Sequence, residues 1–146
     1  MIMAKVEGLD ELIKNCQQME EIIKDVNRKV TDENLKQLVI DSREKAPYKT
    51  GTLKRSIDKR IIEETDSSVT GEYGSDEKYA AIQELGGVVK PKNGKYLVFN
   101  KDGKTIFTRK PVYIPARPYL MPALIEGVDA ILWRYKKAWE ILKDLK

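Results

Sequence analysis

The first third of the chain carries apolar side chains at spacings of three and four residues, the pattern of an amphipathic helix. One apolar stripe covers residues 9–30 and a second covers residues 35–46. Thr31-Asp32 between them is a potential N-cap, so the pattern predicts either one long helix or a helix pair with a break near residue 30. Pro47 ends the segment, because the residue before a proline avoids helical backbone angles. Cys16 lies on the first stripe, and we interpret it as a small buried hydrophobe.

The middle of the chain shows the shorter period of β-strands. Residues 56–64 and 69–73 alternate imperfectly between apolar and polar side chains on either side of a turn at residues 66–68. This pattern predicts a pair of strands joined by that turn. Residues 79–85 carry a short helical pattern, and the glycine pair at 86–87 that follows is typical of a helix end.

A hairpin gives the clearest strand signal. Residues 96–100 and 104–109 flank a turn that offers Gly103 for a positive φ. Lys92-Asn93-Gly94 predicts another turn just before the hairpin. We therefore expect residues from about 88 to 112 to form a protruding hairpin arm.

The C-terminal part predicts a long helix. A proline-rich extended segment at residues 111–118 leads to it, and Pro122 suits the first helical turn, where a missing N–H costs little. Apolar positions then recur over residues 124–145, and Trp133 falls off the centre of this stripe, so we expect it to be partly exposed. The whole chain, residues 1–146, is expected to form a single α+β domain. It would have an N-terminal amphipathic helix or helix pair, a mainly antiparallel sheet with a protruding hairpin, a short middle helix and a long C-terminal helix, with the helices on one face of the sheet.

The composition removes most catalytic chemistry. The chain of 146 residues has no histidine and one cysteine, which excludes a Ser-His-Asp triad, a Cys-His pair and the usual Cys/His zinc sites. The acidic pairs Glu63-Glu64 and Asp76-Glu77 would point apart in strands or turns, and the glycines fit no phosphate-binding loop. We therefore expect no enzyme activity, no catalytic residues, no cofactor and no metal.

The expected compartment follows from what the sequence lacks. No stretch is long and apolar enough for a membrane span, and residues 1–7 lack the apolar core of a signal peptide. With a single cysteine, the chain is expected to be made in a reducing cytoplasm and to have no membrane partner.

Charge is arranged in blocks, although the net charge is only +4. Residues 61–86 carry seven acidic side chains and one basic side chain, whereas residues 87–117 carry eight basic side chains and one acidic side chain. Separated blocks of opposite sign can attract neighbouring copies head to tail.

The basic block surrounds Tyr96, Phe99 and Phe107 of the predicted hairpin. Basic and aromatic side chains together can bind single-stranded nucleic acid by stacking. The alternative, which we favour over sequence-specific binding, is that the aromatic residues alternate to a buried face and the lysines form a solvated rim that blunts a strand edge. Non-specific contact with DNA phosphates stays open, because it needs only clustered positive charge.

Three segments resemble a phage protein family. Residues 46–57 (APYKTGTLKRSI) resemble the signature A-P-x-x-T-G-x-L-x-x-S-I of phage tail-completion, or neck, proteins, the gene-product-ten-like tail components of long-tailed phages and prophages. Residues 79–86 (YAAIQELG) resemble that family's Y-A-x-x-x-E-x-G, and residues 114–124 (IPARPYLMPAL) resemble its I-P-A-R-P-F-L-x-P-A-L box. Their order and spacing also match, although Leu85 stands where an aromatic residue is commoner. A family of virion-morphogenesis proteins shares the I-P-A-R-P box and is the alternative relative.

The resemblance implies a structural protein of the head–tail junction, made in the bacterial host cytoplasm and built into the virion. Such proteins resemble ring-formers, with sixfold symmetry expected, that join the tail tube and tail terminator to the head-closure proteins of the connector. The alternative functions are non-specific DNA binding and an accessory role in virion morphogenesis. Under this resemblance the motif residues determine the fold: Pro47, Thr50, Gly51, Leu53, Ser56, Ile57, Tyr79, Ala80, Glu84, Gly86, Pro115, Arg117, Pro118, Tyr119, Leu120, Pro122, Ala123 and Leu124.

Two local expectations accompany the motifs. Thr50 is expected to cap a short helix at residues 51–56, with Leu53 and Ile57 turned inward. We also hypothesise an ion pair between Arg117 and Glu84, within one subunit or across neighbours, because the planar guanidinium suits bidentate pairing with a carboxylate. The surface between subunits, or the surface that faces DNA in the lumen, is expected to use residues of the charge blocks: Glu72, Asp76, Glu77, Glu84, Lys92, Lys95, Lys101, Lys104, Arg109 and Arg117.

Overall fold

A computed structural model describes residues 9–92, 95–101 and 103–144, so most of the predicted turn at residues 92–94 lies outside the described residues. The helices are α1 (Leu9–Lys45), α2 (Thr52–Ser56), α3 (Ala80–Leu85) and α4 (Leu120–Asp144). The strands are β1 (Ile57–Glu64), β2 (Val69–Ser75), β3 (Gly87–Val89), β4 (Leu97–Lys101), β5 (Lys104–Thr108) and β6 (Val112–Ile114). This is the predicted α+β arrangement, with β3 and β6 as additional strands.

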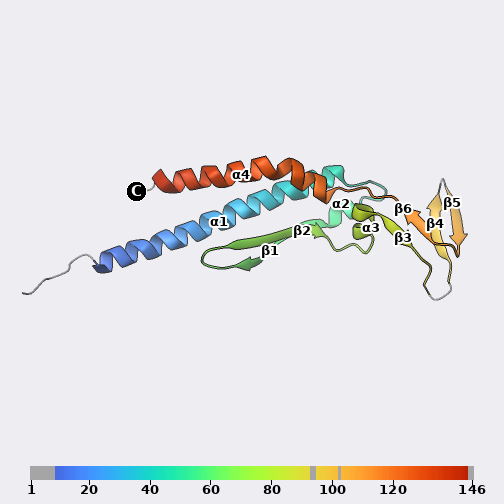
Figure 1. Cartoon of the computed structure of the whole chain (residues 1–146), viewed down its shortest axis with the longest axis horizontal. Coiled ribbons are helices and arrows are strands. Elements are labelled where there is room, and N and C mark those ends of the chain that lie inside the picture. Colours follow the sequence, from blue (N-terminus) through green and yellow to red (C-terminus); the bar gives the residue numbers. More distant parts are fainter. Residues whose placement is uncertain (1–8, 93–94, 102, 145–146) are drawn as a thin grey trace, which may run out of the picture.

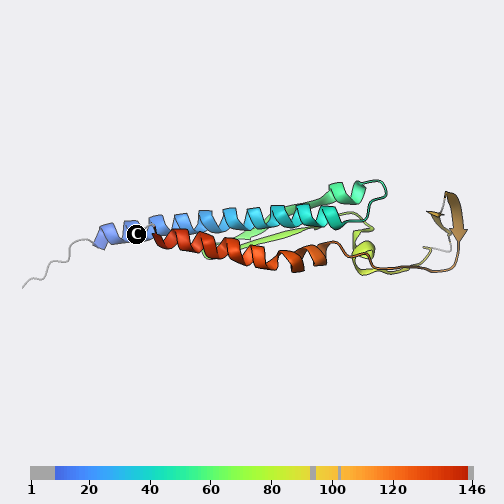
Figure 2. The ribbon, with the colours of Figure 1, turned by 90° about the horizontal axis from the view of Figure 1, so that it is seen from above.

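Helix α1 is the central element of an elongated molecule (Figure 1). The β1–β2 hairpin packs along one side of α1, and α4 packs along another. A view from above shows α1 and α4 side by side (Figure 2). Strands β3 to β6 form an arm at the end of the molecule remote from the C-terminus, so the predicted hairpin protrudes as expected.

Helix α1 is continuous, so of the two predicted alternatives the single helix is correct. Thr31 does not cap a second helix. Its hydroxyl lies 2.6 Å from the Tyr135 hydroxyl of α4 in a part-buried hydrogen bond. Asp32 pairs with Lys36 one turn later and with Lys59 of β1. Both polar residues are therefore used for contacts between elements, and the helical backbone runs through them.

The first apolar stripe is only partly covered, and the prediction that Cys16 is buried is wrong because this residue is exposed. Two ion pairs, Lys24–Asp66 and Arg28–Glu64, mark where the tip of the β1–β2 hairpin meets α1. Helix α4 runs antiparallel to α1 and ends at Asp144. Residues 10–22 of α1 extend past this packing, and all of them are exposed.

The buried core lies where α1 ends and α2, α3 and α4 begin. It is small: its main cluster consists of Val39, Ala46, Leu53, Ile57, Ala80 and Tyr119, with Tyr73 and Leu120 packed against it, and Leu35, Leu38 and Ala123 are also buried. Leu53 and Ile57 are turned inward as predicted. The accessible surface of the chain is 11714 Å². A compact chain of this mass is expected to expose roughly 7700 Å², so the shape leaves an unusual amount of surface open.

The strands form three separate two-stranded antiparallel sheets within the described residues, β1–β2, β3–β6 and β4–β5, rather than one sheet. In β1–β2, Gly71 passes so close to the Leu35 side chain of α1 that a Cβ would clash there. In β4–β5, the turn contains Gly103 with φ 77°, as the hairpin pattern predicts. Helix α4 begins two residues before Pro122, and Trp133 is exposed as expected.

The Asp32 pairs predict a pH-dependent contribution to stability. Hydrogen bonds from Lys36 and then Lys59 hold the pKa of Asp32 below its ordinary value of 3.8. A depressed pKa stabilises the fold above the unfolded-state pKa, and this stabilisation is lost as the pH falls through the folded-state value. We expect Asp32→Asn to lower the free energy of unfolding by up to about 1 kcal/mol at neutral pH, since the site is partly exposed.

Urea unfolding at pH 7 and at pH 2–3 measures this contribution. The difference between wild type and Asp32→Asn should shrink at the lower pH. Asp129→Asn, at an exposed position of α4 with no ion pair among the described residues, is the control and should show little effect at either pH. An equal effect of Asp32→Asn at both pH values would contradict the assignment.

Candidate assembly site

The three sequence motifs meet at one end of α1. Leu53 and Ile57 from the first motif, Ala80 from the second and Tyr119 from the third belong to the same buried cluster. Ala123 of the third motif is also buried. Most other motif residues surround these positions at the surface or half-buried: Pro47, Thr50, Ser56, Tyr79, Pro115, Pro118, Leu120, Pro122 and Leu124. We call the region around α2, α3 and the start of α4 the joint, and α1, α4 and the β1–β2 hairpin the body. The motifs therefore build the joint, which connects the body to the arm.

Glu84 holds the start of α4. Its Oε2 accepts hydrogen bonds from the backbone N–H groups of Tyr119 at 2.7 Å and Leu120 at 3.0 Å, and its Oε1 accepts one from Met121 at 2.9 Å. The first N–H groups of a helix have no partners within the helix, and a negative charge there is favoured by the helix dipole. Glu84 thus supplies from α3 the cap that the third motif lacks.

The hypothesised Glu84–Arg117 ion pair is not formed within the chain. Both carboxylate oxygens of Glu84 are occupied by backbone N–H groups. Arg117 contributes instead through its backbone, whose N–H donates to the Gln83 carbonyl at 2.7 Å, while its side chain is exposed. A sequence signal for the cap did exist: the segment before α4 offers no Ser, Thr, Asp or Asn as N-cap.

Gly86 and Tyr119 complete the joint. Gly86 has φ 68°, and a Cβ on it would lie 2.7 Å from the Ala116 nitrogen, so a side chain would push the third motif away. Tyr119 is fully buried, and its hydroxyl has no hydrogen-bond partner among the described residues. Burial and then the nearby Glu84 carboxylate raise the pKa of Tyr119, which keeps the hydroxyl neutral.

The first motif ties the joint to β2 but not by the predicted cap. Helix α2 starts at Thr52 after Gly51, whose φ is 76°. The Thr50 hydroxyl lies 3.5 Å from the Thr52 nitrogen, too far for a strong cap, so that prediction is wrong. Ser56 is better placed: its hydroxyl donates to the Leu53 carbonyl and lies 2.6 Å from the Ser75 hydroxyl of β2.

A cleft of about 470 Å³ opens beside the joint and is lined by residues of all three motifs. Its walls come from residues 47–53, Tyr79, Gln83 and Arg117. Lys49 and Arg117 are its charged lining residues, so it is basic. The ion pairs among the described residues do not include Lys49 or Arg117.

The acidic block is partly neutralised within the chain. Glu64 pairs with Arg28, Asp66 pairs with Lys24 and Glu72 pairs with Arg60. Glu84 caps α4, as described above. Asp76 and Glu77 remain at the surface or half-buried near the end of β2. The block is therefore a weaker partner for a neighbouring copy than its sequence charge predicts.

The arm keeps its charge at the surface. Lys92, Lys95 and Lys104 are exposed, and the ion pairs among the described residues do not include them. The Arg109 guanidinium lies over the Tyr96 ring, 4.5 Å from its centroid. Lys101 belongs to β4, but its side chain lies outside what the structure describes.

The arm's aromatic residues divide between two faces. Phe99 is half-buried and lines a cleft of about 520 Å³ with residues of β3 and β6. Tyr96 and Phe107 are exposed on the other face of the β4–β5 hairpin. The favoured interpretation, in which all three alternate to a buried face, is therefore wrong for Tyr96 and Phe107.

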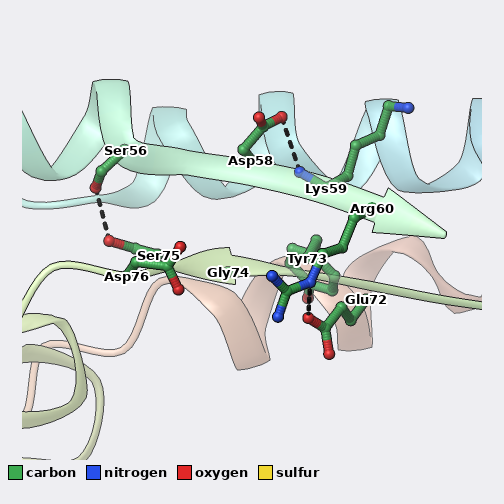
Figure 3. Close-up of a pocket in the computed structure, with 9 residues that line it drawn as sticks. All are labelled: Ser56, Asp58, Lys59, Arg60, Glu72, Tyr73, Gly74, Ser75 and Asp76. Carbon is green, nitrogen blue, oxygen red and sulfur yellow. Dashed lines mark hydrogen bonds and ion pairs between the residues drawn. The ribbon is translucent and has the colours of Figure 1, made fainter. Parts of the chain in front are cut away.

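A polar hollow of about 400 Å³ lies on the β1–β2 hairpin (Figure 3). Arg60 and Glu72 form an ion pair across the strands, and the Ser56 and Ser75 hydroxyls form a hydrogen bond at its end. The Asp58 carboxylate accepts a hydrogen bond from the Lys59 backbone N–H. These groups are engaged with one another rather than converging on a reacting atom. Within the described residues, no cluster of acidic or cysteine side chains suits a metal ion.

Comparison with known proteins assigns the chain to a family. Residues 10–86 match the model of the family described as "Bacteriophage HK97-gp10, putative tail-component". The chain belongs to this family. The comparisons with curated proteins and with solved structures gave no match. Within the described part of the chain, no helix is long and apolar enough to cross a membrane.

Family membership confirms the resemblance and identifies a structural phage tail component, a virion protein that assembles with other virion proteins. The family is not a known enzyme family. The match covers the first two motifs. The third motif lies beyond the matched residues, but Glu84 of the second motif holds it directly.

Removal of the Glu84 cap should destabilise the tail component. Glu84→Ala removes three hydrogen bonds to a charged acceptor, and we expect it to lower the free energy of unfolding by about 2 kcal/mol. Glu84→Gln keeps one acceptor oxygen and should lower the free energy of unfolding by less. Urea unfolding followed by circular dichroism measures both. Glu63→Ala, at an exposed position of β1, is the control, and an effect of Glu84→Ala no larger than this control would contradict the capping role.

Proposed function

We propose that this tail component acts at the head–tail junction, where copies form a ring that joins the tail to the head connector. The family supplies the tail-component role, and the resemblance of the motifs supplies the junction and the expected sixfold ring. The match to the tail-component family also favours this role over the virion-morphogenesis alternative. We treat residues 1–146 as a single domain, because both ends of the arm connect to the joint around α3.

The single observation that carries the proposal is the amount of apolar surface outside the core. Most of the buried apolar residues lie at the joint, and Leu35 and Leu38 extend the core along α1. Large apolar side chains are exposed along α1, along α4 and on both sheets of the arm, including Met19, Leu132, Trp139, Val98 and Tyr113. Soluble monomers rarely expose so much apolar surface, and such surface usually marks a contact with another subunit or protein. A ring requires two different patches per copy, and an elongated molecule with an apolar helix pair at one end and a basic arm at the other offers two.

Particles made without the protein test the junction role. Electron microscopy of lysates from a prophage with this gene deleted should show filled heads and separate tails, and a plasmid copy should restore joined particles. Heads and tails that join normally without the protein would refute the role. Particles with tails of abnormal length but intact junctions would place the protein elsewhere in the tail.

Non-specific DNA contact is the second candidate, and the arm's unneutralised lysines favour it. Removal of four positive charges (Lys92→Ala, Lys95→Ala, Lys104→Ala and Arg109→Ala together) should weaken duplex binding and reduce the slope of log K against log salt by roughly 3–4. Fluorescence anisotropy across a salt series measures this slope. A control with Lys49, Lys54, Lys136 and Lys137 changed to Ala removes the same charge elsewhere. Equal loss from both variants, or no binding by wild type at low salt, would exclude a DNA site on the arm.

A further inference from the structure

Two exposed apolar seams of this chain are complementary, and we propose that they pack against each other between copies. The α4 seam consists of Met121, Ile125, Val128, Leu132, Tyr135, Trp139 and Leu142. The α1 seam consists of Leu12, Cys16, Met19 and Ile23. In the proposed contact, the projecting part of α1 from one copy lies along the C-terminal half of α4 of a second copy.

The α4 seam has the spacing of a helix–helix interface. Its positions alternate by four and three residues over three turns and more, which keeps them on one face that can pack against another helix. Ile125, Leu132 and Trp139 are 66%, 61% and 53% exposed. The chain's own α1 reaches only one edge of this face, where the Tyr135 hydroxyl meets Thr31.

A different face of α4 contacts α1. Gly127 lies against the Leu38 side chain, and the Arg134 guanidinium donates to the Asn34 amide oxygen at 2.9 Å. Ala123 and Gly127 are among the less exposed residues of α4. Because successive helical residues are about 100° apart, these two positions lie about a quarter turn or more from the seam. The seam is therefore open at Ile125, Leu132 and Trp139, whereas Tyr135 and Leu142 lie at its edge toward α1.

The α1 seam is open because α1 is longer than its partners. Thr31 of α1 faces Tyr135 of α4, and the two helices run in opposite directions. Helix α4 ends nine residues after Tyr135 at Asp144, so residues of α1 well before Thr31 have no α4 residues beside them. Leu12 and Met19 are 58% and 53% exposed. A helical stretch of this length is only marginally stable without packing, which favours a partner for it.

The opposite charges and equal lengths of the two helical segments favour the pairing of these two seams. Residues 10–22 carry four acidic side chains and one basic, whereas residues 132–144 carry four basic and two acidic. Lys136 and Lys143 follow seam residues directly and lie seven residues apart, so both flank the same side of the α4 seam. Each segment has thirteen residues, about 20 Å of helix. An acidic helix therefore meets a basic one of equal length.

The contact is heterologous, since each copy uses α1 on one side and α4 on the other, and it leaves one seam of each outer copy free for a further subunit. It rests on the proposed ring for its setting, whereas the contact itself can be tested on the purified full-length chain. The partly neutralised acidic block at residues 61–86 is not needed for it. The partner that covers each seam is thus a second copy of this chain.

Photo-crosslinking from Cys16 tests the contact. Cys16 is the chain's single cysteine and is exposed, so a benzophenone maleimide labels one position within the α1 seam. Labelled protein is mixed with unlabelled, ¹⁵N-enriched protein, irradiated and digested, and the isotope pattern separates contacts between copies from contacts within one copy. We expect products between copies on residues 132–144. Products on other segments of the second copy, products within one copy only, or protein that stays monomeric at its highest soluble concentration would each overturn the proposal.

Two tryptophans provide a matched pair of variants. Trp139 lies in the α4 seam, whereas Trp133 lies off it, is 59% exposed and carries Lys137 over its ring. Trp139→Ala should weaken self-association at least about tenfold in sedimentation equilibrium, and Trp133→Ala should change it less than about threefold. Circular dichroism confirms that both variants fold. Equal effects of the two variants would overturn the seam assignment.

The outcome is independent of the particle experiment. Crosslinks in the expected segments together with normal head–tail joining in the deletion would keep the contact and refute the junction role. Failure to join in the deletion, with no crosslinks to α4 of a second copy, would keep the role and refute the contact.

Discussion

The architecture depends on the hydrogen bonds that the Glu84 carboxylate accepts. This carboxylate lies on a six-residue helix and accepts three backbone hydrogen bonds from the start of α4. The segment before α4 contains prolines on both sides of Arg117 and has no cap of its own. Without the carboxylate, the long C-terminal helix would begin with unpaired N–H groups beside a small buried core. One side chain thereby couples the middle of the sequence to its end.

Local patterns predicted the elements well because each is governed by periodicity and turn chemistry. The helical spacing of residues 9–46, the hairpin around Gly103 and the helix end at Gly86 are all found in the structure. The break near residue 30 could not be excluded from sequence, because a threonine suits both a cap and a contact with the tyrosine of a distant helix. The pairing of β3 with β6 was also missed, since three-residue strands carry too little pattern.

The candidate site was predicted less well, because its chemistry depends on which residues meet in space. Glu84 and Arg117 were both correctly selected as motif residues, but the acid binds backbone and the base contributes its own backbone. Cys16 sits on an apolar stripe whose covering helix stops short of it. Periodicity identifies an apolar face, whereas only the relative lengths of packed helices decide whether the same chain covers it. The charge blocks behaved in the same way: α1 and β1 pair with three of the seven side chains of the acidic block, Glu64, Asp66 and Glu72, and no described acidic residue pairs with Lys92, Lys95 or Lys104.

The two connections between body and arm have a mechanical consequence. β3 follows Gly86 directly, and β6 ends three residues before Arg117, whose backbone is bound to Gln83. Both β3 and β6 are therefore connected to α3 over a few residues. Helix α3 in turn binds the first turn of α4 through Glu84. Hydrogen bonds spanning only a few residues therefore link the arm to the start of α4. A force on the arm would act first on the start of the long helix, before any other part of it.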